Sequence, residues 1–467
     1  MLSFLHRGRG FYRGMALLAI PIILQNLITE SLGLVDTFMV GMLGEAELAA
    51  VTVANIPIFV ILLLIFGIQS GSSVLISQHW GKRDTDTINR VVGIGRYVAL
   101  SISALFAAVM FFFPVQFMGL FNNDANLAAI AASYGKIVGS SYIFNSDTQV
   151  YIGAHRSMEH PRLGLYILSV SMCSNTFLNW VLIFGNLGAP KMGVVGAATA
   201  TLISRILEFI VMVCYASFNR RFKLKPKLLL RPGTALFRQF VRYSTPVVMN
   251  ETLWGLGTSL YPTIMGHMAG SQEILAAFAI SGNIEKICTV AVFAVAGTAA
   301  IIVGREIGAG RADTVYDVGL ALNTVAFSTG LAVGLVMIGV TFLFIQPIVY
   351  PLFGLSQGAR EIATMMLLVT FLTLSVRSFN ATNIVGVLRG GGDVRAASLI
   401  DLSPLWLVAL PLAALAGLVF HMGIFWVYLA LSMENVVKFF LGVSRLRSGA
   451  WIHDVTQMSF KKEEKPE

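Results

Sequence analysis

The sequence predicts an all-α integral membrane protein with 12 transmembrane helices in two pseudo-symmetric six-helix bundles. Three observations lead to this class. Of the 467 residues, 56% are hydrophobic and only 12% are charged, whereas soluble domains carry about 25% charged residues. Apolar runs of about 20–25 residues, long enough to cross a bilayer as helices, recur along the chain. Finally, the two halves of the chain repeat each other's motifs.

The apolar runs define twelve expected spans. Glycine and proline inside them are tolerated in membrane helices, and nothing alternates with the ten-residue period of a membrane barrel. We expect the spans at residues 15–40, 51–76, 92–115, 127–151, 162–185, 193–217, 240–267, 275–303, 317–346, 360–385, 397–420 and 423–444.

The distribution of basic residues predicts the orientation in the membrane. The loops on the N-terminal side, the span ends and the two tails carry nearly all Lys and Arg, most densely in "NRRFKLKPKLLLRPGTALFRQFVR". The opposite loops hold Glu45, Glu47, Asp124 and Glu273. Under the positive-inside rule both termini are cytoplasmic in a multi-pass cell-membrane protein. The net charge of +9 therefore indicates contact with anionic membrane lipids and no nucleic acid partner.

The internal repeat predicts the domain organisation. The motif "WGKRDTDT" (80–87) parallels "IGAGRADT" (307–314), and "GAHRSMEHPR" (153–162) parallels "GVLRGGGDVR" (386–395). Each half has an even number of spans, so both enter the membrane from the same side, as in transporters with parallel repeats. We expect an N-terminal lobe at 1–217, a basic cytoplasmic linker at 218–239, a C-terminal lobe at 240–445 and a cytoplasmic tail at 446–467.

Ionisable residues inside the spans are candidates for function. A charge at the centre of a membrane helix costs about 2.5–3.5 kcal/mol by insertion scales, so such groups face protein or water. Spacing predicts structural pairs for Arg205 with Glu208 and for Glu434 with Lys438. Four others lie near span ends, form bridges between helices or carry function: Glu285, Lys286, Arg377 and Asp401. The remaining charged residues inside the spans are Glu30, Asp36, Asp147 and Glu251.

Asp36 has no basic residue within reach on its own helix, so its partners must come from other spans. The fifth span offers Asn175 and Asn179, one turn apart on the same face, and the sixth offers Thr199 and Thr201. One carboxylate with amide and hydroxyl oxygens could hold Na⁺, or it could cage a carboxylic acid that takes up a proton. A purely structural hydrogen bond between Asp36 and an asparagine is the alternative.

Glu251 opens the second half in "VVMNETLWGLG". Its place in the repeat is one position beyond Asn26 rather than that of Asp36, so the halves are not chemically equivalent. A second proton or cation site, contact with a cationic substrate and a structural role all remain open for Glu251.

The chain resembles the multidrug and toxic compound extrusion (MATE) transporters over about residues 14–445. The resemblance rests on "PIILQNLITESLGLVDTFMVGMLGEAELAAV", "FLNWVLIFG", "MGVVGAATAT" and "VGVLRGGGDVR". It implies a bacterial cation-coupled exporter with NorM-like and DinF-like features and two six-helix lobes that alternate between outward- and inward-facing states. It also implies that Asp36 is central to coupling, with Asn175, Asn179 and Thr201 as the remaining ligands of the amino-terminal cation cluster.

The resemblance departs from the family pattern at two places. Asn179 stands where some DinF-like members have Asp. Glu251 matches the glutamate of NorM-like members, but its acidic partner on the tenth span falls on Ser378. The second-lobe proton, cation or substrate site at Glu251 and Ser378 is therefore incomplete, which leaves the amino-terminal cluster as the better candidate for coupling.

These inferences together predict an antiporter that exports hydrophobic or cationic drugs and toxic compounds, coupled to Na⁺ or H⁺ and without a cofactor. A lipid-linked sugar flippase of the same superfamily is the alternative. An enzyme is not expected, because the sequence has no HExxH motif and no clustered His and Cys ligands. A monomer embedded in lipid is expected, with small molecules as its other partners.

Overall fold

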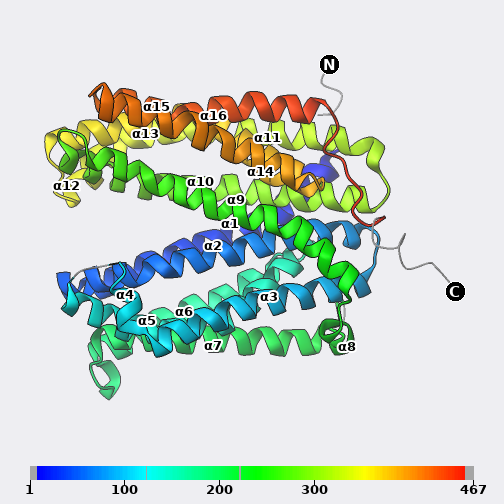
Figure 1. Cartoon of the computed structure of the whole chain (residues 1–467), viewed down its shortest axis with the longest axis horizontal. Coiled ribbons are helices and arrows are strands. Elements are labelled where there is room, and N and C mark those ends of the chain that lie inside the picture. The colour runs from blue at the N-terminus through cyan, green and yellow to red at the C-terminus, as the bar shows by residue number, and fades with distance from the viewer. Residues whose placement is uncertain (1–7, 122–123, 220–221, 458–467) are drawn as a thin grey trace. The chain divides into compact units, whose positions relative to one another are not determined.

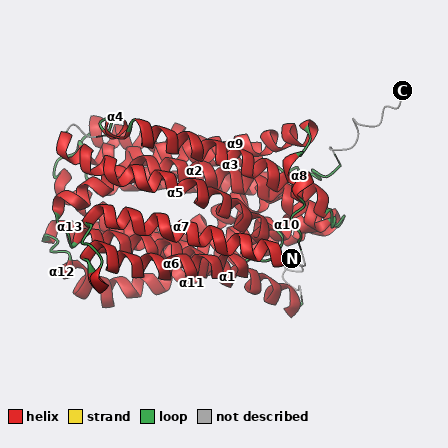
Figure 2. Ribbon diagram, turned by 90° about the horizontal axis from the view of Figure 1, so that it is seen from below, coloured by secondary structure: helices red, strands yellow, loops and turns green. Residues whose placement is uncertain are grey.

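The structure is a computed structural model that describes residues 8–121, 124–219 and 222–457. Parts of the expected N-terminal lobe, basic linker and C-terminal tail therefore lie outside the described residues. Within the described ranges the chain is helical, with short connecting loops (Figure 2). One isolated β-bridge joins Gly392 and Ile452 in these ranges. The predicted all-α class is confirmed.

In the first half of the chain the described residues form six long helices and three short ones. Figure 1 labels the α-helices among them. Their bounds are α1 Arg9–Gly41, α2 Glu45–Gly81, α3 Thr85–Phe112, α4 Pro114–Met118, α5 Ala125–Ser157, α6 Arg162–Phe184, η2 Asn186–Gly188, α7 Gly193–Phe218 and α8 Pro226–Leu230.

In the second half, three of the six spans pass through wider helical turns and are therefore divided into several segments. Two of these spans contain proline, which cannot complete the regular hydrogen-bond ladder. The bounds are α9 Thr234–Gly266, α10 Ser271–Gly308, α11 Ala312–Val340, η3 Thr341–Val349, α12 Tyr350–Leu352, α13 Gln357–Ala381, η4 Thr382–Leu388, α14 Val394–Pro404, η5 Leu405–Ala409, α15 Leu410–Ala414, η6 Leu415–Val419 and α16 Ile424–Arg447.

Each predicted span coincides with one of these helices or continuous helical runs. Eleven helices among the described residues are long and apolar enough to cross a membrane. The remaining expected span lies in α9, which has 33 residues and is not among these eleven helices. The difference follows from its sequence, since Asn250 and Glu251 lie in the middle of α9.

The chain divides into two compact units. Unit 1 comprises Met1–Ala19 and Met249–Glu467, and unit 2 comprises Ile20–Val248. The division therefore runs through two helices: the beginning of α1 belongs to unit 1, and the beginning of α9 belongs to unit 2. Pro21 and Pro246, which occupy matching places in the repeat, lie close to these two divisions.

Within unit 2, α5 packs against α2, α3 and α7, and α6 packs against α7 (Figure 1). Small residues allow the beginning of α9 and the linker helix α8 to approach closely. A Cβ atom on Gly71 would lie 2.5 Å from Cα of Ser244, and one on Gly93 would lie 2.4 Å from the carbonyl oxygen of Leu229. Neither position accepts a larger side chain without moving the facing backbone.

Within unit 1, α13 packs against α10, α11 and α16. The residues after α16 fold back onto this unit. Trp451 is fully buried and joins an apolar cluster that also contains Leu18 of α1 and Leu322 of α11. The first part of the predicted C-terminal tail is therefore packed against the helices.

The loop between α2 and α3 is fixed by Asp84, which caps the N-terminus of α3. Its Oδ1 accepts a hydrogen bond of 3.0 Å from the backbone amide of Thr87. The ring of His79 lies 3.3 Å away, from Nδ1 to Oδ2 of Asp84. The contact with His79, followed by that with Thr87, holds the pKa of the Asp84 carboxyl well below its usual range.

Candidate functional site

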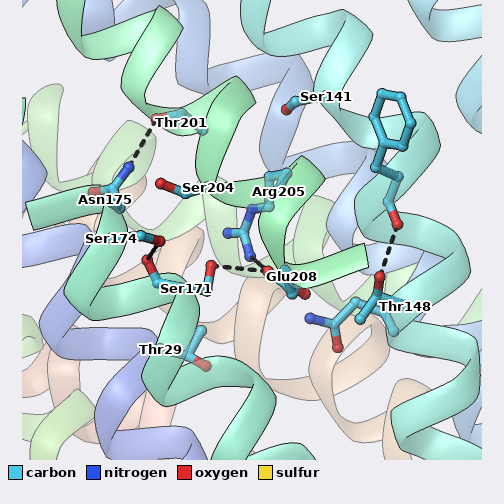
Figure 3. Close-up of polar contacts among 12 residues, drawn as sticks. Thr29, Ser141, Thr148, Ser171, Ser174, Asn175, Thr201, Ser204, Arg205 and Glu208 are labelled. Atoms are coloured by element: carbon cyan, nitrogen blue, oxygen red, sulfur yellow. Dashed lines mark hydrogen bonds and ion pairs between the residues drawn. The ribbon is translucent and has the colours of Figure 1, made fainter. Parts of the chain in front are cut away.

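In unit 2 the structure brings Asp36 together with the partners that the sequence analysis selected. Asn175 and Asn179 lie one turn apart on the buried face of α6. Asn179 donates through Nδ2 to Oδ1 of Asp36 on α1 and, at 3.0 Å, to Oδ1 of Asn175. Asn175 donates in turn to Oγ1 of Thr201 on α7 at 3.3 Å (Figure 3). The three helices thus share one continuous chain of hydrogen bonds.

Thr199, the other hydroxyl considered from the sequence, is not part of this chain. Its Oγ1 donates to the carbonyl oxygen of Val195 on the same helix at 2.8 Å.

The hydrogen bonds leave oxygen atoms free to receive a cation. Oδ1 of Asn179 is buried and has no hydrogen-bond partner among the described residues, and the one carboxylate is bonded to a neutral amide. Among the described residues, no three His, Cys, Asp or Glu side chains gather into a set that could hold a metal ion. The carboxylate, amide and hydroxyl oxygens of this cluster are donors of the kind that hold a small cation or, at the carboxylate, a proton.

The same seam between α6 and α7 continues into an ion pair one turn further along. Nη1 of Arg205 lies 2.6 Å from Oε2 of Glu208, which also accepts a hydrogen bond of 2.9 Å from Ser171 (Figure 3). The predicted pairing of Arg205 with Glu208 is confirmed. Because Glu208 already neutralises Arg205, the cluster formed by Asp36, Arg205 and Glu208 has one carboxylate in excess.

A second buried ion pair of unit 2 was missed from the sequence. Arg96 on α3 binds Asp147 on α5 with two hydrogen bonds of 2.5 and 2.6 Å. Asp147 was recognised as a charged residue inside a span, but its partner lies 51 positions away. Only the internal position of Arg96, in the middle of an apolar helix, could have indicated this pair.

In unit 1, Glu251 on α9 is bound by Arg389, which lies just after η4. Nη1 of Arg389 is 2.7 Å from Oε1 of Glu251. Ser378 on α13 packs against Gly330 of α11 instead, and its hydroxyl has no hydrogen-bond partner among the described residues. The carboxylate of Glu251 is therefore paired with the guanidinium group of Arg389 and not with the hydroxyl of Ser378.

The pair of Glu434 and Lys438 on α16 also has an additional member. Nζ of Lys438 is 3.6 Å from Oε2 of Glu434 but only 2.9 Å from Oδ1 of Asp401 on α14. Asn250 donates to the other oxygen of Asp401 at 2.9 Å. Asp401 thus links α9, α14 and α16.

The residues that the structure describes form twelve long helices or continuous helical runs in two units, with charged side chains buried among them, as in a polytopic helical membrane protein. Buried ionisable groups of this kind are typical of membrane transporters. The comparisons with known proteins agree with this class. The model of the MatE family matches residues 21–181 and 246–415, one segment in each half of the chain.

The relatives that match this chain do so over most of its length. A protein of Bacillus subtilis named "Probable multidrug resistance protein YoeA" is 27% identical over 410 residues, which cover 86% of each chain. A protein of Thermotoga maritima named "Probable multidrug resistance protein NorM" is 22% identical over 435 residues, which cover 93% of this chain and 92% of the relative.

Solved structures share the fold. A MOP superfamily transporter from Pyrococcus furiosus, whose binding pocket is described as having reverse polarity, matches with a TM-score of 0.83 at 18% identity, over 96% of this chain and 98% of that one. The eukaryotic MATE transporter AtDTX14 matches with a TM-score of 0.82 over the same shares. The chain belongs to the MatE family, whose members are membrane transporters and not enzymes. The resemblance stated from the sequence is confirmed.

Proposed function

We propose that this protein is a cation-coupled antiporter that exports hydrophobic and cationic small molecules across the cell membrane. The observation that supports this proposal most directly is the excess carboxylate of Asp36. Its neighbours Asn179, Asn175 and Thr201 supply only neutral groups. A buried carboxylate without a cationic partner is costly, so Asp36 gains a great deal from taking up H⁺ or Na⁺.

Uptake and release of this positive charge would drive alternating access. With the cation bound, the cluster is close to neutral and tolerates a closed, dry environment. Without it, the charge on Asp36 favours a state in which water reaches the site. A ligand shifts such an equilibrium only by its different affinity for the two states. Exchange at Asp36 meets this condition because charge and hydration change together.

The substrate class is proposed from the relatives. The Bacillus subtilis and Thermotoga maritima proteins are both named as probable multidrug resistance proteins. The chain carries 19 methionine and 32 phenylalanine residues, side chains whose soft or flat surfaces can accept many shapes. We therefore propose drug-like and cationic compounds as substrates, and no resident cofactor.

The test uses the purified protein in proteoliposomes loaded with ethidium. A Na⁺ gradient and a pH gradient are imposed separately, and the gradient that drives ethidium movement identifies the coupling ion. Asp36→Asn should abolish this transport while the protein is expressed and folds normally. Asp124→Asn makes the same chemical change at the N-terminal cap of α5, where asparagine caps equally well, and should transport like the wild type.

Transport at the wild-type rate in Asp36→Asn would refute the coupling role of Asp36. If neither gradient moved ethidium, the drug-export proposal would fail, and flipping of a lipid-linked sugar would be tested next in the same vesicles.

We also propose a cytoplasmic location for both termini, with residues 1–217 and 240–445 as the two lobes, 218–239 as the cytoplasmic linker and 446–467 as a cytoplasmic tail. We further propose a monomer in direct contact with membrane lipids. Labelling of single cysteines placed at Thr85 and Asp124, on opposite predicted sides, tests the orientation.

A further inference from the structure

The guanidinium group of Arg156, in the last turn of α5, is partly buried but has no acidic partner among the described residues. It is hydrogen-bonded to an amide instead: Nη2 of Arg156 donates to Oε1 of Gln69 on α2 at 3.2 Å. An amide oxygen has no net charge, so this bond leaves the positive charge of Arg156 uncompensated. Such charges are costly in a membrane helix and often mark a functional site.

Other cations of the long helices are compensated. Five of them each contact a carboxylate of their own unit: Arg96 with Asp147, Arg205 with Glu208, Arg377 with Glu285, Arg389 with Glu251 and Lys438 with Asp401. Arg96 and Arg205 are partly buried, as Arg156 is. A difference in burial therefore does not explain why Arg156 lacks an acid.

The internal repeat identifies the missing acid. Arg156 and Arg389 occupy the same place in the paired motifs at 153–162 and 386–395. Arg389 binds Glu251 of α9 at 2.7 Å. In the first half of the chain α1 corresponds to α9, and its sequence at the matching place is "QNL", which contains no acid. Unit 2 has therefore kept the arginine of the repeat without its carboxylate.

The packing beside the two arginines corresponds as well. A Cβ atom on Gly153 would lie 3.1 Å from Cγ of Gln69 on α2, and one on Gly386 would lie 2.8 Å from the carbonyl oxygen of Ala296 on α10. Gln69 and Ala296 are at matching places relative to the motifs that end α2 and α10. Each arginine thus follows a glycine at which the neighbouring span comes close, so the two sites can be compared directly.

Unpaired donors gather around Gln69. Gln149, Gly153 and Arg156 lie on one face of α5, because they are spaced by four and then three residues. Nε2 of Gln69 donates to the carbonyl oxygen of Gln149 at 2.5 Å, while Oε1 of Gln69 accepts from Arg156. Nε2 of Gln149 has no hydrogen-bond partner among the described residues. The unused N–H groups of Arg156 and Gln149 therefore lie on either side of Gln69, ready for an anion.

We infer that Arg156 binds one phosphate group, with Gln149 as a second donor. Arginine presents its N–H groups in a fixed fork that matches two oxygens of a phosphate. Because α5 ends at Ser157, the site is at the end of a span, where the phosphate of a lipid headgroup and that of a soluble compound can both reach it. The bound phosphate supplies the negative charge that Glu251 supplies to Arg389 in unit 1.

The first arm of the test uses a soluble source of phosphate. Radioactive inorganic phosphate is titrated onto the purified, delipidated full-length protein in maltoside micelles, which contain no phosphate. If the ligand is a soluble compound, the wild type binds one phosphate per chain, and Arg156→Gln binds it about tenfold more weakly or not at all. The matched control Arg162→Gln makes the same change at an exposed arginine at the start of α6 and should bind like the wild type.

The second arm uses a lipid source. Phosphatidylglycerol is added to the same micelles, and native mass spectrometry counts the lipid molecules that each protein retains. If the ligand is a lipid headgroup, the wild type and Arg162→Gln each retain one phosphatidylglycerol more than Arg156→Gln. The two arms therefore distinguish the two sources of the phosphate.

A further variant supplies the missing acid while the arginine remains. Gln69→Glu places a carboxylate where the amide oxygen now accepts from Arg156 at 3.2 Å, so the guanidinium is occupied from within the protein. We expect Gln69→Glu to lose the phosphate in whichever arm the wild type binds it.

The inference is overturned if Arg156→Gln and Gln69→Glu bind both probes as the wild type does, or if Arg162→Gln weakens binding as much as Arg156→Gln. It is also overturned if the wild type binds neither probe. That result needs no variant, so a folding defect in one of the variants would not protect the inference. None of these outcomes affects the proposed antiport, because exchange at Asp36 is measured by ethidium transport.

Discussion

Removal of the Arg389 guanidinium is the perturbation with the largest predicted effect on stability. Arg389 is 1% exposed, and its partner Glu251 is 13% exposed, so Arg389→Gln leaves a largely buried carboxylate without its cation. Breaking a buried ion pair on one side costs about 3–5 kcal/mol. Because Glu251 keeps some contact with its surroundings, we expect the lower end, about 3 kcal/mol.

The double variant Arg389→Gln/Glu251→Gln distinguishes two contributions to the loss of stability: the loss of the ion pair itself, and the burial of an uncompensated Glu251 carboxylate. Neutralising both partners removes the uncompensated carboxylate, and replacing a buried ion pair by neutral groups is often close to neutral in free energy. We expect the double variant to recover at least half of the stability lost in the single variant.

The assay is equilibrium unfolding of the purified protein in mixed micelles with increasing dodecyl sulfate, followed by circular dichroism. Arg311→Gln serves as the control, because Arg311 pairs with Glu306 while 54% exposed and such surface pairs contribute about 0–1 kcal/mol. The reasoning is refuted if the single and double variants unfold at the same denaturant concentration, or if Arg389→Gln is no less stable than Arg311→Gln.

Three further predictions test the cluster, the packing and the loop. Asn179→Asp adds a carboxylate beside the proposed exchange site, so half-maximal ethidium transport should require several-fold less of the coupling cation, and an unchanged requirement would contradict the assignment. Gly71→Ala places a methyl group against the backbone at Ser244 and should destabilise unit 2 by about 1–3 kcal/mol. The control Gly33→Ala, at a position with open space around it, should leave the stability unchanged. Equal unfolding midpoints for the two variants would exclude the close contact. Asp84→Ala should lower the free energy of unfolding by about 1 kcal/mol at neutral pH. Because the pKa of Asp84 is lowered in the fold, the difference in stability from the wild type should be lost only as the pH falls below about 3.9, the ordinary pKa of an aspartate. A difference that persists in acid would rule out the charged cap.

The sequence predicted the contacts around Asp36 better than those around Glu251. Asn175 and Asn179 are one turn apart, and that spacing alone predicted a shared polar face toward Asp36. The pair of Arg205 and Glu208 followed from spacing in the same way. The repeat and the resemblance did not reveal the ion pair of Glu251 with Arg389, because those residues are 138 positions apart and meet only through the packing of α9 beside the end of η4.

The spacing of residues along α16 predicted only one of the two carboxylates that contact Lys438. The sequence correctly indicated Glu434 four residues earlier, but the structure shows Asp401 as the closer partner. An ammonium group on a flexible stem can reach another helix as readily as its own. Its choice is decided by which carboxylate the neighbouring helix presents, and nothing in the sequence near Lys438 carries that information.

The sequence by itself determined the membrane class, the positions of the spans, the family resemblance and the polar face around Asp36. These features depend on local hydrophobicity and on helical periodicity, both of which can be counted along the chain. The tertiary structure alone decided which acids have cationic partners, because burial and charge compensation depend on side chains from distant helices. That is why Glu251, prominent in the sequence, is held by Arg389, while Lys438, first assigned to Glu434 alone, lies closer to Asp401.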